Sequence, residues 1–240
     1  MVVAFFSDVC SGIAAQKERD SMSYGVKLAV WGDYALFTRP ELKVERVSYD
    51  CLTPSAARGI LEAIFWHPGL KWCIDRIKVC RPIRYANIRR NEVGIKADKS
   101  QIAQAITTGK RIAIVAGQEI QQRASMVLKD VQYVIEAHFD MTSKASPSDN
   151  PGKFVEMFKR RARKGQCFHQ PYLGCREFPC HFALVEDETA YPSCYEGGSR
   201  PLGLMLYDMD YRDPADIKPI FFQAELNDGI MDLRDCEVYR

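Results

Sequence analysis

The feature that most constrains the fold is an alternating strand followed, one loop later, by a capped helix. Every second residue from Val131 to Phe139 is apolar, the two-residue period of a strand with one buried face, and His138 falls on the more polar face. Asn150 is a good N-cap, Pro151 suits the first helical position, and Gly165 suits the end of a helix whose last turn is cationic. The pair predicts a β-α unit.

A similar unit stands near the N-terminus. The range Tyr24–Val30 alternates as a strand, and Thr53-Pro54 begins a helix that Pro68-Gly69 ends. Lys71–Ile83 alternates with a slip near Arg76, which predicts a β-bulge, and Cys175–Val185 is expected to form another strand. This order predicts an α+β, ferredoxin-like fold of the RAMP or RRM type. Two helices would cover one face of a four-stranded antiparallel sheet and leave the other face open.

The remaining segments give the expected domain organisation. Residues 1–22 show no steady period and are interpreted as an N-terminal extension; residues 23–188 form the ferredoxin-like domain. Residues from about 85 to 125 interrupt the pattern as an insertion, with a short helix expected at Lys99–Thr108. Residues 189–240 are predicted to form a small acidic C-terminal β domain, with strands at Leu204–Met209 and Ile220–Leu226.

The stretch around the second helix suggests a partner. Between Pro151 and Phe182 there are seven Lys/Arg and two acidic residues, interleaved with aromatic side chains. Cations that follow a phosphate backbone, beside rings on which bases stack, are typical of proteins that bind single-stranded nucleic acid. The alternative is one amphipathic helix with a solvated basic face.

Charge and cysteine content narrow the class of protein. From Val185 onward, five Lys/Arg face 13 Asp/Glu, so a basic body precedes an acidic end although the net charge is only +2. This suits a protein that holds a polyanion on one side. The nine cysteines are many, but their number is odd and the chain is too long for a cystine scaffold; the first residues resemble neither an export signal nor a membrane span. We expect a cytoplasmic protein with reduced thiols and no membrane partner.

Several blocks are similar to a known family. They are Trp31–Pro40, Lys43–Tyr49, Pro54–Trp66, Arg81–Ile83, Arg89–Val93, Ala137–Phe139 and Leu173–Phe178. Together they resemble the Cas-five family of CRISPR-associated proteins, in its subtype I-C (Dvulg) branch. The resemblance implies an endoribonuclease that binds the repeat hairpin of CRISPR precursor RNA and cuts it without a metal or cofactor. It also implies retention on the 5′ handle of the guide RNA, beside the backbone and large subunits of the type I-C interference complex.

The resemblance also implies catalytic positions. The family pattern places a tyrosine near the end of the first helix and a Lys-His pair at the start of the second. These fall on Phe65, Lys153 and Phe154. Phenylalanine transfers no proton, so we expect Lys153 to stabilise the phosphorane and His67 to be the first candidate for the missing group. The weaker candidates are His138, Tyr49 and His169.

The expected RNA contacts lie on the insertion, the strand before the second helix, the second helix itself and the loop after it. They are Arg89, Arg90, His138, Arg160, Arg161, Arg163, Lys164, Tyr172 and Arg176. We also expect the rings of Phe65 and Phe154 to stack on a base. A zinc site built from the cysteines and histidines at positions 167–181 is a weaker alternative, because their spacing lacks the usual cysteine pair.

Two functional alternatives remain open. The first is a subunit that binds guide RNA without cutting it, with cleavage lost through Phe65 and Phe154. The second is a nonspecific double-stranded DNA binder, whose affinity would not depend on sequence and would fall steeply with salt.

Overall fold

The computed structural model describes residues 25–42, 44–96 and 98–240. The expected extension, residues 1–22, lies outside the described residues. The helices are α2 (Pro54–Ile64), α3 (Lys99–Thr108) and α4 (Pro151–Arg163), with short 3-10 turns at Ala116–Gln118 and Glu188–Ala190. The strands are β1 (Val26–Ala35), β2 (Arg46–Val47), β3 (Leu70–Val79), β4 (Tyr85–Val93), β5 (Ile120–Met141), β6 (His181–Leu184), β7 (Ser199–Asp210), β8 (Lys218–Asn227), β9 (Ile230–Asp232) and β10 (Val238–Tyr239).

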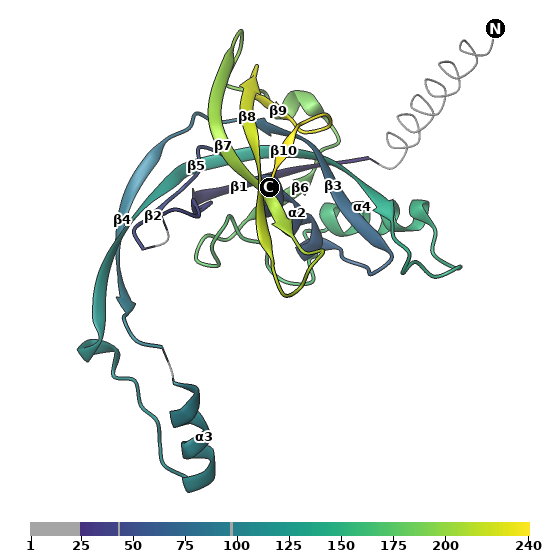
Figure 1. Ribbon diagram of the computed structural model, residues 1–240. Coiled ribbons are helices and arrows are strands. Elements are labelled where there is room, and N and C mark those ends of the chain that lie inside the picture. The colour runs from purple at the N-terminus through teal and green to yellow at the C-terminus, as the bar shows by residue number, and fades with distance from the viewer. Residues whose placement is uncertain (1–24, 43, 97) are drawn as a thin grey trace, which may run out of the picture.

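The centre of the molecule is the predicted ferredoxin-like sheet (Figure 1). Its strands run in the order β3-β5-β1-β6, and each neighbouring pair is antiparallel. The helix α2 follows β1 and α4 follows β5. The expected α+β class and the strand-helix-strand order are therefore confirmed.

Both helices begin as their sequences predict. The Thr53 hydroxyl accepts a hydrogen bond from Ala56 N, and the Asn150 side chain accepts one from Gly152 N, so each N-cap satisfies an amide that the helix leaves unpaired. Both helices bury one face against the sheet: the Phe158 ring of α4 lies 4.9 Å from that of Trp72 on β3, centroid to centroid.

Some boundaries differ from the expectations. The bulge in β3 is present, between Ile74 and Arg76, but the strand ends at Val79. The expected strand at Cys175–Val185 is wrong for its first half. Leu173 N donates to Phe178 O, so residues 172–179 close a tight loop, and only His181–Leu184 pairs with β1.

The expected insertion forms a long arm within residues 85–128, and its predicted helix at Lys99–Thr108 is confirmed, but the paired strands of the arm were not predicted. Here β4 pairs antiparallel with the first half of β5, from Tyr85 opposite Leu128 to Val93 opposite Ile120. The arm carries α3 at its far end, away from the sheet (Figure 1). No residue of α3 is buried, so this helix contributes nothing to the core.

The C-terminal strands continue the same sheet. Through β9 they are hydrogen-bonded to β3, with Arg76 opposite Asp232. The Arg58 guanidinium of α2 also forms two hydrogen bonds with the carboxylate of Asp208 on β7, at 2.8 and 3.0 Å. The boundary at residues 188/189 remains a prediction, but the C-terminal strands are firmly joined to the central sheet.

The expectation of an open sheet face is wrong in two respects. The segment Glu188–Tyr195 crosses the face opposite the helices: Lys27 ion-pairs with Glu188, and Lys78 Nζ donates to Tyr191 O at 3.4 Å. This face also carries both basic and acidic side chains, which form ion pairs with one another, as Lys27 and Glu136 do at 3.2 Å. It is therefore not a cationic surface. Any cationic surface around Lys153 therefore belongs to the helical side. Among the described residues, no helix is long and apolar enough to cross a membrane.

Candidate functional site

The end of α2 and the start of α4 meet at one end of the sheet. The helix α2 ends at Ile64, because Phe65 has an extended backbone (φ −149°, ψ 115°). Trp72 Nε1 donates to Phe65 O at 3.0 Å and fixes this turn. The next residues, Trp66 and His67, therefore lie in a loop beside the N-terminus of α4.

The two phenylalanines in the expected catalytic positions are core residues. Phe65 is 4% exposed and Phe154 is 2% exposed, with their ring centroids 5.8 Å apart. The expectation that these rings stack on a base is therefore wrong, since neither presents a free face. Their role is to hold the end of α2 against α4.

His67 takes the exposed place beside them. Its ring packs on Phe154 with centroids 4.8 Å apart, and its side chain is 35% exposed. Its Nδ1 accepts a hydrogen bond from Gly69 N at 3.0 Å and lies 3.9 Å from an oxygen of Asp149. With Nδ1 used as an acceptor, the neutral ring carries its proton on Nε2 and presents a donor. His67 lies beyond the end of α2, because the helix has already ended at Ile64.

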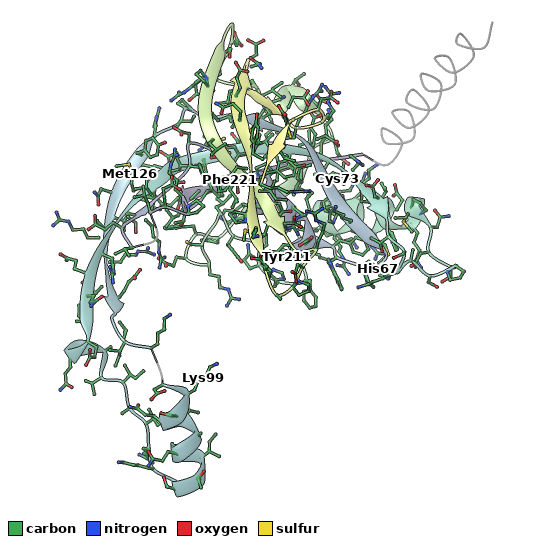
Figure 2. The ribbon with its side chains drawn as sticks, in the orientation of Figure 1. His67, Cys73, Lys99, Met126, Tyr211 and Phe221 are labelled. Atoms are coloured by element: carbon green, nitrogen blue, oxygen red, sulfur yellow. The ribbon has the colours of Figure 1, made fainter. Side chains whose placement is uncertain are left out.

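Lys153 is exposed in the first turn of α4, one residue before the buried Phe154. A cation at a helix N-terminus adds to the partial positive charge of the unpaired amides. Lys153 and His67 therefore offer a positive charge and a proton donor on two adjoining segments. Figure 2 shows His67 at the end of the molecule that lies away from the arm.

Trp66 was not predicted as a site residue. Its side chain is 61% exposed although it follows the buried Phe65 directly. The sequence carries a signal for this, because a tryptophan in a short loop that ends in Pro68-Gly69 lies outside the helix whose apolar face is buried. An exposed indole that adjoins His67 in the sequence provides a surface on which a base can stack.

The cations at the end of α4 do not form one surface. Arg161 turns inward: its Nη1 donates to Ile64 O at 2.8 Å, and its guanidinium lies 5.1 Å from the centre of the Phe65 ring. Arg163 pairs with Glu186 at 2.7 Å. Arg160 and Lys164 are exposed. The structure therefore separates Arg161 from the expected phosphate contacts.

A second group gathers at the base of the arm. Arg90 on β4 ion-pairs with Glu177 and donates to Ser125 Oγ at 3.0 Å, so much of its hydrogen-bonding capacity is already used. Arg89 and Arg176 are exposed. Because Glu177 belongs to the loop 172–179, the ion pair ties this loop to the arm; Arg176 lies on the loop, and Arg89, next to Arg90 in the strand, faces the other side of the arm.

A cleft of about 370 Å³ lies between this loop and the start of α2. Its wall includes Thr53, Ser55, Tyr49, His169 and Tyr172. The loop is fixed by a hydrogen bond of 3.0 Å from the amide of residue 36 to the carbonyl of residue 173. The cleft has the size and the mixed polar and aromatic lining that suit a nucleobase.

The remaining candidates lie elsewhere. Tyr49 is 2% exposed, and burial raises the pKa of its hydroxyl, so it is not an accessible base. His138 lies on the sheet face opposite the helices, where hydrogen bonds to Asp75 and Cys73 raise the pKa of its ring to about 10. Its position argues against direct cooperation with Lys153.

The expected zinc alternative is not supported. Among the described residues, the group whose ligand atoms come together is Cys73, His138 and Asp140, rather than the cysteines and histidines of residues 167–181. Burial raises the pKa of Cys180 to about 12, which opposes formation of a thiolate ligand there.

The comparisons with known proteins agree on a family. A family model described as CRISPR-associated protein (Cas_Cas5) matches residues 25–234. A curated protein from Mannheimia succiniciproducens, named CRISPR pre-crRNA endoribonuclease Cas5d, is 53% identical over 218 residues, which cover 88% of this chain and 96% of the relative. Its namesake from Thermus thermophilus is 40% identical over 236 residues, covering 90% and 95%.

Two solved structures share the fold at 23% identity. One is described as a CRISPR-associated protein (TM-score 0.65; 90% of this chain and 96% of that chain covered). The other is a functionally uncharacterized protein from Streptococcus mutans (TM-score 0.64; 90% and 97% covered). With a family model across most of its length and a relative of 53% identity, this chain belongs to the Cas5 family of CRISPR-associated proteins.

Proposed function

We propose that this protein is a CRISPR pre-crRNA endoribonuclease. The observation that carries the proposal is its 53% identity to a relative of that name, 96% of which it covers. The site supports the assignment, because Lys153, His67 and Trp66 surround the point where the end of α2 meets the N-terminus of α4. These three side chains supply a cation, a proton donor and a stacking surface.

The chemistry is an internal transesterification. The ribose 2′-oxygen attacks the adjacent phosphorus, the bond from phosphorus to the 5′-oxygen breaks, and the products are a 2′,3′-cyclic phosphate and a free 5′-hydroxyl. Lys153 and the positive end of α4 stabilise the charge that grows on the phosphoryl oxygens. The Nε2 proton of His67 goes to the departing 5′-oxygen. This route needs no metal at the scissile phosphate.

The 2′-proton has no assigned acceptor at this site. Phe65 and Phe154 occupy the positions where the family pattern has a tyrosine and a histidine, and neither ring accepts a proton. The 2′-proton therefore passes to water. Since a positioned base contributes roughly 10²–10⁴-fold, we propose that this protein cuts its RNA more slowly than relatives that retain all three groups.

We further propose that the protein stays on the 5′ handle of the guide RNA as a subunit of the type I-C interference complex. The cleft beside Tyr172, with the exposed Arg89 and Arg176, is the second part of the RNA surface. The thiols of the described cysteines are free, and we place the protein in the reducing cytoplasm. The competing proposal is a subunit that binds guide RNA without cutting it. It is favoured by Phe65 and Phe154, whose rings neither accept nor donate a proton.

The test is incubation of the purified protein with its own repeat RNA in EDTA. We expect one defined cut that leaves a cyclic phosphate. Lys153→Ala should abolish this cut, while Lys144→Ala, at an exposed lysine in the loop before α4, should leave it unchanged. If the RNA is bound tightly but is not cut, the protein is a subunit that only binds guide RNA. Equal affinity for unrelated DNA duplexes with a steep salt dependence would show a nonspecific DNA binder.

A further inference from the structure

A thiol, an imidazole and a carboxylate come together on β3 and β5. Cys73 and His138 are directly opposite each other in the antiparallel register, and Asp140 is two residues further along β5 on the same face. One ligand atom from each lies within 4.8 Å of the other two. Figure 2 shows Cys73 on β3, and the cluster is on the sheet face opposite α2 and α4.

His138 is held in an orientation that suits a metal ligand. Its Nδ1 lies 2.8 and 3.0 Å from the two carboxylate oxygens of Asp75, which leaves Nε2 for a ligand on the other side of the ring. Asp75 reaches this position because of the bulge after Ile74, and Leu233 N donates to Asp75 O at 2.8 Å. A carboxylate that fixes the second nitrogen of a histidine is the usual support of metal-binding imidazoles.

The surroundings favour a bound cation. The thiol of Cys73 lies 3.6 Å from Asp140 Oδ2, a long and weak hydrogen bond. The nearest basic residue in the register is Lys71, opposite Asp140 and exposed, while the charge of Arg76 is already met by Asp232 and Glu136. The carboxylates of Asp75 and Asp140 would attract a divalent ion, and binding of that ion would displace the protons of the thiol and the imidazole.

We propose that Cys73, His138 and Asp140 bind a transition-metal cation of the zinc class. Sulfur, nitrogen and oxygen ligands together suit Zn²⁺, and three protein ligands leave a fourth position for water. Ligand atoms in a tetrahedral zinc site lie about 3.3–3.8 Å apart, given bonds of about 2.0–2.3 Å. Side-chain rotations that move the ligand atoms by about 1 Å would therefore bring the three ligands to this spacing. The cluster and Lys153 lie on opposite sides of the sheet. The metal therefore links β3 to β5 and takes no part in RNA cleavage, and the proposal does not rest on that activity.

The test uses the full chain, stripped of metal with a chelator and titrated with Co²⁺ alone. We expect one equivalent to bind, with the near-ultraviolet absorption of a cobalt-thiolate bond. Cys73→Ser should abolish that absorption, and His138→Gln and Asp140→Asn should each weaken binding. The matched control is Cys194→Ser, since Cys194 is an exposed thiol outside the cluster, and it should bind as the wild type does.

One further variant and a thermal measurement keep the proposal falsifiable. Asp75→Asn should keep the cobalt-thiolate absorption but lower the affinity about 10–100-fold, as for a positioning residue. Zinc at about 100 times its dissociation constant should raise the melting temperature by about 5–10 °C in the wild type. It should do so far less in Asp140→Asn, whose exposed position makes it tolerant of the change. The proposal is overturned if cobalt gives no thiolate absorption, or if that absorption survives Cys73→Ser in a folded protein.

Discussion

Arg161 provides the sharpest test of how the two helix ends are held together. The sequence analysis expected its guanidinium to contact phosphate, but the structure turns it inward. Its Nη1 donates to the carbonyl oxygen of Ile64 at 2.8 Å, and the group lies over the Phe65 ring at 5.1 Å. That carbonyl is one of the last four of α2, which the helix itself leaves unpaired. Arg161→Ala should therefore destabilise the junction of the two helices.

The expected magnitude follows from these two contacts. A hydrogen bond from a charged donor contributes about 1.5–3 kcal/mol, and a partly exposed cation-π contact adds about 0.5–1 kcal/mol. Because relaxation and water recover part of this, we expect Arg161→Ala to lower the free energy of unfolding by about 2–3 kcal/mol. For a chain of this length, that corresponds to a melting temperature lower by about 4–12 °C.

The neighbouring Arg160 supplies the matched control. It is exposed on the same helix, so Arg160→Ala should change the free energy of unfolding by no more than about 0.5 kcal/mol. Urea denaturation followed by tryptophan fluorescence measures both variants, and binding of the repeat RNA is measured where both are fully folded. Equal stability of the two variants would refute the structural role. A selective loss of RNA affinity in Arg161→Ala would instead support the phosphate contact that the sequence suggested.

Three further predictions follow from the same reasoning. Gly174→Ala should be far more destabilising than Gly165→Ala in thermal unfolding: both glycines have positive φ, but only at Gly174 would a methyl group overlap a backbone oxygen of a neighbouring segment. Trp66→Ala should weaken binding of the repeat RNA by about 1–3 kcal/mol in a filter-binding assay with no change in fold, and an unchanged affinity would exclude stacking. Asp232, whose pKa is held well below its usual range chiefly by a hydrogen bond from a nearby arginine, stabilises the fold above the pKa of the unfolded chain. Its contribution is lost as pH falls from about 4, so urea unfolding at successive pH values should show a smaller acid loss in Asp232→Asn than in the wild type.

Local patterns were sufficient to predict the central fold. The N-caps Thr53 and Asn150 and the alternation of β5 are decided by neighbours in the sequence, so each could be recognised there. The bulge near Arg76 could also be seen as a slip in alternation. The strand pairing of the arm could not be predicted, because β4 is paired with β5 across a helix and more than 25 intervening residues. None of the β4 residues is buried, and its less exposed face carries Arg90 and Glu92 as well as Ala86 and Ile88, so hydrophobicity does not alternate along the strand.

The candidate site was predicted less well, because a charge in the sequence does not show what it is paired with. Arg161, Arg163 and Arg90 all looked available for phosphate. In the fold they meet the carbonyl of Ile64, Glu186 and Glu177 respectively. Partners between 23 and 97 residues away are set by tertiary structure alone. Of the expected cationic contacts, Arg160, Lys164, Arg89 and Arg176 are exposed and have none of these partners, so the proposed RNA surface is smaller and more divided than the sequence suggests.

His67 provides a partly exposed imidazole close to the position where the family pattern has a histidine and this chain has Phe154. Phe154 turns its ring into the core, and His67 packs its ring against the outer side of Phe154 at 4.8 Å. An imidazole at position 67 can occupy this exposed place because α2 ends at Ile64 and the loop brings residue 67 back over α4. The same loop fixes Nδ1 on the amide of Gly69, so the histidine can donate from Nε2 but has no second lone pair with which to take the 2′-proton. In the proposed mechanism, the backbone of this turn thus accounts for a site that has an acid and a cation but no base.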